Sequence, residues 1–363
     1  MMSLSRRECT AMRGIAILGI VLHNYCHWLS MAVKENEYTF SQANVSSLVH
    51  AVGNPTWNLP IHLLSFFGHY GVPIFLFLSA YGLTMKYEIG GAEDRVWTFI
   101  KTHFVKLFSM MIVGFAAFIM VDRMIDAPHH YHFIDVAAQL GLFNNLLPNP
   151  DHVIWPGPYW FFGLMMQLYI VYRLFLYKRH WGVTVVFMLV CFLLQAFCSP
   201  VGDTLNRLRY NFIGGMLPFG LGLLYGRLTV LKQEKDFFGK PEKALLGKPE
   251  KPLVKISMAF LTGTFLLIII YKWSLSYQLW FWVPAVICLF CVLIVKIAPA
   301  GINNLLVWTG TISSAMFVCH PITRKIFIGI SRHGDIYTGL LMYVIATLVL
   351  SMGFSFILQK RRG

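Results

Sequence analysis

The feature that most constrains this chain is the recurrence of long apolar segments from one end to the other. Each is close to the roughly 20 residues that a helix needs to cross a bilayer. Lipid offers no partners to an irregular backbone, so we expect all of these segments to be helices. The sequence predicts an all-α, polytopic membrane bundle of about ten transmembrane helices, with residues 1–363 as one domain. The predicted spans are 12–32, 66–86, 104–122, 157–177, 181–199, 212–230, 256–273, 278–298, 304–322 and 337–358.

Composition supports this interpretation. The chain is 57% hydrophobic and only 13% charged, whereas a soluble domain carries about 25% charged residues. The net charge of +14 could suggest a nucleic-acid partner. The cations, however, gather at the ends of apolar segments and in alternate loops, so we expect a lipid bilayer as partner and no nucleic acid.

Most of the 7 cysteines lie inside apolar segments, where we expect them to act as small hydrophobes rather than disulfides or metal ligands.

The distribution of Lys and Arg predicts the orientation. With ten spans both termini share one side, which receives 22 of the 30 cations, and the other side receives 8. The positive-inside rule then places both termini in the cytoplasm of a multi-pass inner-membrane protein. Residues 231–255 form a predicted flexible, basic cytoplasmic loop in which Gly-Lys-Pro-Glu-Lys occurs at 239–243 and again at 247–251. Such a loop is most simply a solvated tether, although it could touch anionic lipid.

The first span carries an unusual line of polar residues. Arg13 opens a run of apolar and glycine residues that ends at His23, with Asn24 next and His27 one helical turn further. A histidine inside a membrane helix costs free energy unless it is paired or faces a cavity, so a functional role is the first interpretation. Arg13 and His23 lie about 15 Å apart along a helix axis. The arginine suits a phosphate-bearing donor at one membrane face, and the deeper histidine suits removal of a hydroxyl proton.

A predicted outer loop over residues 123–155 is rich in histidine and aspartate, which can bind metals. Its histidines lack the fixed spacing of a metal site. We therefore predict no metal and expect the loop to contact an acceptor substrate.

Four further stretches carry polar or aromatic residues at span ends. The second span opens with Gly68 and contains Ser79, and its small residues permit close helix packing. A basic cluster begins the third span, an aromatic group begins the fourth, and a histidine followed by proline ends the ninth. The residues of interest in these stretches are His69, Ser79, Lys101, Lys106, Trp160, Tyr169 and His320.

Taken in order, these stretches resemble the acyltransferase 3 family of integral membrane acyltransferases, over most of the chain. The resemblance lies partly in the opening Arg-Gly-Ile-Ala-Ile-Leu with its downstream histidine. Residues 71–83 look like the family's Gly-Val-x-x-Phe-Phe-x-Leu-Ser-Gly-Phe-x-Ile, and the Ser-x-x-x-Phe-x-x-His-Pro pattern ends at Pro321. The basic cluster, Trp160 with Tyr169, and the glycine-rich residues 214–226 agree with it.

The resemblance implies an O-acyltransferase that moves an acyl group, usually acetyl, from cytoplasmic acyl-CoA to a carbohydrate hydroxyl of a cell-envelope or exported glycan. Acyl-CoA would be the donor substrate, and no metal is implied. The catalytic candidates are His23, Arg13, Asn24 and His27. The donor-binding candidates are Arg13, Lys101, Lys106 and Ser79. The acceptor-binding candidates are Trp160, Tyr169, His69 and His320.

The identity of the base stays open between two histidines. The family usually has one more residue between the arginine and the histidine than this chain has. On an ideal helix His23 lies about 80° around from Arg13, whereas His27 lies about 40° from it. A local bulge can absorb a one-residue slip, so we favour His23. Asn24 or a backbone amide would stabilise the oxyanion.

Two other classes fit a bundle with intramembrane histidines: a proton-coupled secondary transporter and a glycolipid flippase. Against them, no Asp or Glu lies in the middle of a predicted span, and the two halves show no evident repeat. Release of coenzyme A by the pure protein separates an acyltransferase from both.

Overall fold

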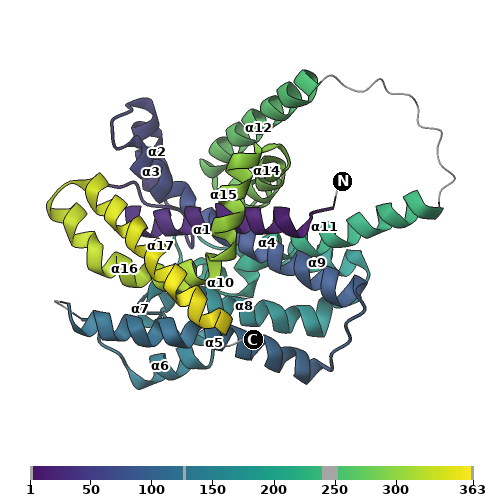
Figure 1. Cartoon of the computed structure of the whole chain (residues 1–363), viewed down its shortest axis with the longest axis horizontal. Helices are drawn as coiled ribbons and strands as arrows, with labels where there is room; N and C mark the ends of the chain where they lie inside the picture. The colour runs from purple at the N-terminus through teal and green to yellow at the C-terminus, as the bar shows by residue number, and fades with distance from the viewer. Residues whose placement is uncertain (1–2, 126–127, 239–251, 361–363) are drawn as a thin grey trace.

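The computed structural model describes residues 3–125, 128–238 and 252–360, and every regular element in these ranges is helical (Figure 1). The prediction of an all-α chain is therefore confirmed. Helix α1 (Arg6–Cys26) runs through the middle of the bundle in Figure 1. It begins at Ser5, whose hydroxyl accepts the Glu8 N–H while the Glu8 carboxylate accepts the Ser5 N–H. This capping box fixes the start of the helix that carries the first polar line.

Helix α1 contacts α4 (Gly71–Leu83), α15 (Ala300–Thr311) and α16 (Ser313–His333), which come from opposite ends of the chain. Small residues permit this closeness. A Cβ added at Gly14 would lie 2.0 Å from the Leu306 carbonyl oxygen, and one at Gly68 would lie 2.6 Å from the His23 Cβ. The predicted role of the glycines at the start of the second span is thus confirmed at Gly68, which holds the backbone of that span against His23.

Six helical segments are long and apolar enough to cross a membrane, or seven if one bent pair counts as a span. This agrees with a multi-pass membrane bundle. Each of the ten predicted segments overlaps a helix, but several are short, such as α9 (Trp181–Ala196) and α14 (Val283–Ile297). The total of ten spans and the cytoplasmic termini remain predictions. The qualifying segments are Arg6–Cys26, Leu59–Ile89, Val96–Arg123, Gly157–Leu176, Ser257–Ser274 and Ile336–Phe356.

The segment Leu59–Ile89 joins α3 (Leu59–Phe67), η1 (Gly68–Tyr70), α4 and η2 (Thr84–Ile89). The other helices are α2 (Gln42–Gly53), α5 (Val96–Arg123), α6 (Phe133–Leu140), η3 (Asn144–Leu146), α7 (Pro150–Val153), η4 (Gly157–Tyr159), α8 (Trp160–Val171), η5 (Tyr172–Leu176), α10 (Asp203–Tyr210), α11 (Phe212–Phe238), α12 (Pro252–Ser274), α13 (Tyr277–Trp280) and α17 (Ile336–Lys360).

Three sequence-based boundaries differ from the structure. The first span ends at Cys26 rather than near residue 32, because the chain turns back there and Lys34 donates to the Leu29 carbonyl oxygen at 3.1 Å. Residues 45–65, predicted as a loop or re-entrant segment, belong mostly to α2 and α3. The predicted span 304–322 is broken at Ile312, and its two halves meet at 71°.

The described ends of the predicted loop 231–255 are helical. Helix α11 continues to Phe238 and α12 begins at Pro252, so both flanks of the predicted loop are helical. The two Gly-Lys-Pro-Glu-Lys repeats at 239–243 and 247–251 lie outside the described residues.

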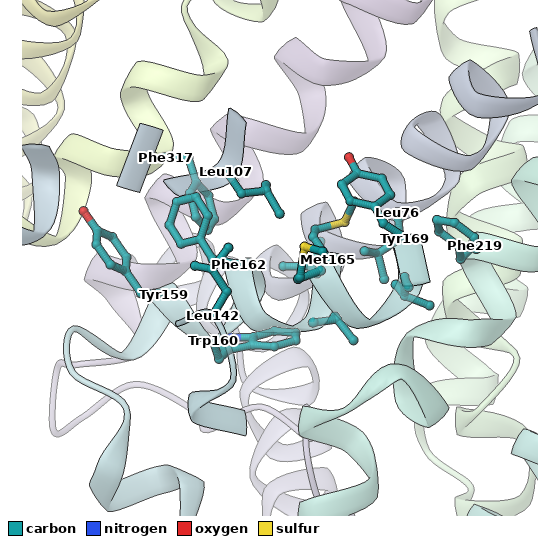
Figure 2. Packing of buried hydrophobic residues seen from close by; sticks show 14 of the residues in the cluster. Leu76, Leu107, Leu142, Tyr159, Trp160, Phe162, Met165, Tyr169, Phe219 and Phe317 are labelled. Atoms are coloured by element: carbon teal, nitrogen blue, oxygen red, sulfur yellow. The ribbon is translucent and has the colours of Figure 1, made fainter. Parts of the chain in front are cut away.

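The largest buried apolar cluster packs around α8. Its aromatic and sulfur side chains fill the space between α8, α4, α5 and α16. Figure 2 shows Trp160 and Tyr169 toward opposite ends of this cluster, with Met165 between them. Nine residues along α8 separate the two rings by about 13 Å, close to the separation of Arg13 and His23 on α1.

Candidate active site

A cavity of about 330 Å³ lies at the carboxyl-terminal end of α1, and we call it the chamber. It receives His23 and Asn24 from the last turns of α1, Trp160 from the start of α8, and Arg324 from α16. Loop residues between Cys26 and α2, and others around α7, complete its wall. The chamber therefore gathers side chains far apart in the sequence, such as Asn24 and Arg324, which are 300 positions apart.

His23 is fixed in one orientation. Its side chain is 6% exposed, and Nδ1 lies 2.8 Å from the carbonyl oxygen of Ser65. A carbonyl oxygen only accepts hydrogen bonds, so Nδ1 carries the hydrogen in a neutral ring and Nε2 keeps its lone pair. The neighbouring rings are His27, stacked at 5.2 Å between centroids, and His69, edge-on at 5.6 Å. The structure thus brings three predicted site histidines together around one fixed imidazole.

His27 is engaged by a carboxylate that the sequence analysis did not single out. Its Nδ1 lies 3.0 Å from Oε2 of Glu35 in the loop after α1. Burial raises the pKa of Glu35, but the hydrogen bond from His27 and the charge of that ring outweigh burial and hold the pKa well below its usual value. Glu35 is therefore an anion beside the two stacked histidines.

His23, His27 and Glu35 are also a possible metal-ligand set, since one ligand atom from each lies within 4.8 Å of the others. Zinc bonds of about 2.1 Å in tetrahedral geometry would hold the ligand atoms about 3.4 Å apart. The direct His27–Glu35 hydrogen bond already satisfies both groups. A divalent ion could enter only if that bond opened, so we interpret the set as a hydrogen-bonded cluster.

Asn24 is held by a buried arginine. Its Oδ1 accepts a hydrogen bond of 2.6 Å from Nη1 of Arg324, which is 3% exposed. The guanidinium also lies over Trp28, with 4.5 Å from Cζ to the ring centroid. Asn24, a predicted oxyanion ligand, is thereby fixed at the edge of the chamber.

Aromatic rings form one wall of the chamber. The ring of Tyr38 stacks on Tyr210 at 3.8 Å between centroids, and the Trp160 ring is nearly perpendicular to both. Tyr210 donates a 2.7 Å hydrogen bond to Asp151. Burial, reinforced by the charge of Glu35, raises the pKa of the adjacent Glu37 to about 8.

Two side chains that line the chamber present polar atoms without a partner among the described residues. They are both ring nitrogens of His69, whose side chain is 4% exposed, and Nε1 of Trp155. Buried polar groups are normally hydrogen-bonded. These atoms are exceptions to that rule, and they are buried behind the chamber surface rather than accessible from it.

The histidine-rich outer loop reaches the edge of the chamber. Asp122 of α5 pairs with Lys325 at 2.7 Å and accepts hydrogen bonds from the His129 backbone and the Tyr131 hydroxyl. This anchors the ring of His129 against Trp155, with 5.0 Å between centroids. The expectation that this loop contacts an acceptor substrate remains a prediction.

A second polar site, the Tyr169 cluster, lies at the other end of α8. We define it as Arg13, Ser79, His103, Lys106 and Tyr169. The Ser79 hydroxyl lies 3.0 Å from that of Tyr169, and the His103 ring lies 4.4 Å from the Tyr169 ring. The positive charges of Arg13 and Lys106 act on Tyr169 and His103 respectively. Of the predicted donor-binding residues, Ser79 thus contacts Tyr169 directly, and Arg13 and Lys106 lie within electrostatic range of the cluster.

Three predicted site residues are placed differently from expectation. Tyr169, predicted with the acceptor-binding set, lies beside Ser79 rather than in the chamber. His320 is fully buried, one helical turn before Arg324, and its Nδ1 bonds to the Met316 carbonyl oxygen. It is not one of the described residues that line the chamber. Lys101 is exposed and lies about 140° around α5 from Lys106.

The residues that sequence reasoning missed are Glu35, Arg324, Trp155, Tyr38 and Tyr210. Glu35 had a weak signal, as an acidic residue eight positions after His27 in a chain poor in acids. Arg324 had another, because it lies one helical turn after His320. The aromatic residues gave none, since aromatic residues are common at membrane interfaces.

Comparison with known proteins places the chain in a family. The sequence model described as an acyltransferase domain, that of the acyltransferase 3 family, matches residues 8–360. The chain therefore belongs to the acyltransferase 3 family and is a multi-pass membrane acyltransferase. No curated protein and no solved structure matches the chain.

Proposed function

We propose that this acyltransferase moves an acyl group, most simply acetyl, from cytoplasmic acyl-CoA to a hydroxyl of a cell-envelope or exported carbohydrate, at the inner membrane. The observation that carries the proposal is the buried and oriented imidazole of His23. Its Nδ1 is committed to the Ser65 carbonyl oxygen and its ring borders the chamber. A desolvated base with a fixed tautomer suits removal of a hydroxyl proton.

In the proposed reaction, Nε2 of His23 takes the proton of the acceptor hydroxyl as its oxygen attacks the thioester carbon. A carbon–oxygen bond forms, and the carbonyl oxygen becomes negatively charged. When the carbon–sulfur bond breaks, the electrons of the oxyanion restore the carbonyl group, and the leaving thiolate takes the proton from the His23 imidazolium. The products are an ester and free coenzyme A.

His23 suits the base better than His27. Nδ1 is engaged in both rings, by the Ser65 carbonyl oxygen in His23 and by Glu35 in His27, but His23 is the more deeply buried of the two, at 6% against 30% side-chain exposure. Stacking places the His27–Glu35 pair directly against His23. The negative charge of Glu35 then favours the imidazolium that His23 becomes during the reaction.

A carbohydrate acceptor is supported by the chamber lining. Aromatic side chains such as Trp160 provide apolar surface for a sugar ring, and polar side chains that line the chamber, such as Asn24 and Asp151, suit its hydroxyl groups. The acyl-CoA donor is supported at the Tyr169 cluster, where the exposed charges of Arg13 and Lys106 suit phosphate groups.

The proposal is tested with the purified protein in detergent or nanodiscs, supplied with labelled acetyl-CoA and envelope glycan fractions. We expect coenzyme A release coupled to label in the glycan, and loss of both in His23→Ala. His50→Ala, which alters an exposed histidine on α2, is the matched control and should keep wild-type activity. Full activity in His23→Ala would remove the assigned base. Absence of coenzyme A release from the wild type with every acyl donor would favour a carrier or flippase.

A further inference from the structure

Two neighbouring cations on α16 differ in their pairing. Lys325 forms an ion pair with Asp122, whereas none of the ion pairs among the described residues includes Arg324. Arg324 is nonetheless the more deeply buried of the two, at 3% exposure. Removing a guanidinium from water costs a large free energy unless a partner or ligand compensates for it. The contacts of Arg324 therefore indicate which group its buried charge stabilises.

Those contacts orient one amide. Nη1 of Arg324 donates to Oδ1 of Asn24, and both residues line the chamber that holds His23. A guanidinium has only donors, so the oxygen of Asn24 must face Arg324 and its NH₂ group must face away. Nδ2 of Asn24 has no hydrogen-bond partner among the described residues. A fixed donor is thus available beside the imidazole of His23.

We propose that Arg324 is a positioning residue for acyl transfer, which holds Asn24 so that its NH₂ group binds the carbonyl oxygen as that oxygen becomes negatively charged. The inference rests on the proposed function and deepens it. Stabilisation of an oxyanion by a fixed donor is effective because the donor does not reorganise during the reaction. The positive charge on the far side of the amide polarises its N–H bonds further.

Asn24→Asp separates positioning from donation. The aspartate keeps an oxygen for Arg324 and adds an ion pair, but it has no N–H to offer an oxyanion. We expect kcat to fall about 100-fold, with the KM for acetyl-CoA within about threefold of wild type and no loss of thermal stability. A purely structural role for Asn24 predicts the opposite pattern, a stable and active enzyme, and that result would overturn the proposal.

Arg324→Met tests the positioning step itself, because methionine fills much of the same space without charge or donors. We expect kcat to fall about 100-fold again. Since the two residues act as one unit, Arg324→Met combined with Asn24→Ala should be no slower than Asn24→Ala alone. Losses that multiply would contradict the proposal. Arg332→Met is the matched control, because Arg332 also lies over Trp28, at 5.9 Å, but is exposed; it should retain activity within about twofold.

The outcomes distinguish this inference from the proposed function. If the wild type releases no coenzyme A, the proposed function fails and the oxyanion role with it. If the wild type is active and Asn24→Asp is equally active, only the role of Arg324 and Asn24 is overturned. Should Arg324→Met fail to fold, the stable Asn24→Asp variant decides alone.

Discussion

The two polar sites along α1, the Tyr169 cluster near Arg13 and the chamber near His23, have opposite surroundings. At the Tyr169 cluster, the charged side chains of Arg13 and Lys106 are exposed. At the chamber, His23, Asn24 and Arg324 are nearly buried, and each has a defined hydrogen bond. Exposed charges attract ions through a long-range and salt-sensitive field, whereas buried groups of fixed orientation act on reacting atoms. The comparison therefore predicts that the first end governs donor binding and the second governs chemistry.

The largest expected effect is at the chamber. His23→Ala removes the proposed base, and we expect kcat to fall at least about 100-fold, because positioned general bases contribute 10²–10⁴-fold. Acetyl-CoA binding, measured separately by titration calorimetry, should change little because the donor end is intact. A His23→Ala variant that loses donor binding as well as kcat would contradict the separation of donor binding from chemistry.

The next effect concerns the His27–Glu35 pair. Glu35→Gln removes the negative charge beside the stacked histidines, and we expect kcat to fall about tenfold through lost stabilisation of the imidazolium. His27→Ala should have a similar effect, and the double variant should be no slower than the worse single variant. Steady-state kinetics of the three proteins measure this. Fully multiplicative losses would show that the pair does not act as a unit.

At the other end, Arg13→Gln should raise the KM for acetyl-CoA about tenfold and leave kcat within about threefold, because the charge is exposed and attracts donor phosphates. The difference from wild type should shrink as ionic strength rises. Kinetics at low and high salt provide the measurement. A large fall in kcat at saturating donor would instead place Arg13 in the chemical step, as the family pairing of Arg13 with His23 allows.

A smaller difference in the KM for acetyl-CoA is expected between variants of Lys106 and Lys101 in α5. Lys106 acts on His103 within the Tyr169 cluster, whereas Lys101 lies on another side of α5. We expect Lys106→Gln to raise the KM for acetyl-CoA about threefold and Lys101→Gln to leave it unchanged. Equal effects of the two substitutions would indicate that only the total charge of this membrane face matters.

The smallest effect is on stability. Because the pKa of Glu37 is raised to about 8, native Glu37 keeps a proton between about pH 4.3 and pH 8 that the unfolded chain has released. The free energy of unfolding therefore falls as pH rises through this window. Glu37→Gln does not titrate, so its melting temperature should exceed that of the wild type above pH 8 and match it near pH 4. Glu93→Gln, at an exposed side chain, should show no alkaline gain.

Local patterns in the sequence predicted much of this molecule. Apolar segments located the helices, and the polar line in the first span pointed to His23 and Asn24. Their limits were less predictable. The first helix ends at Cys26, where Lys34 of the returning loop donates to the carbonyl oxygen of the C-cap residue His27. The ninth span breaks at Ile312, where α15 packs closely against α1. Neither the end of α1 nor the break at Ile312 has a signal in the local sequence, because both depend on contacts with other parts of the bundle.

The sequence by itself determined the helical class, the spacing of Arg13 and His23 along one helix, and the family, because all three follow from residue order within short windows. Only the tertiary structure decided the partners: Ser65 for His23, Glu35 for His27 and Arg324 for Asn24. Those contacts depend on which faces of distant helices meet. Helical periodicity fixes the direction of each side chain on its own helix, but packing across the bundle chooses the neighbour that it reaches.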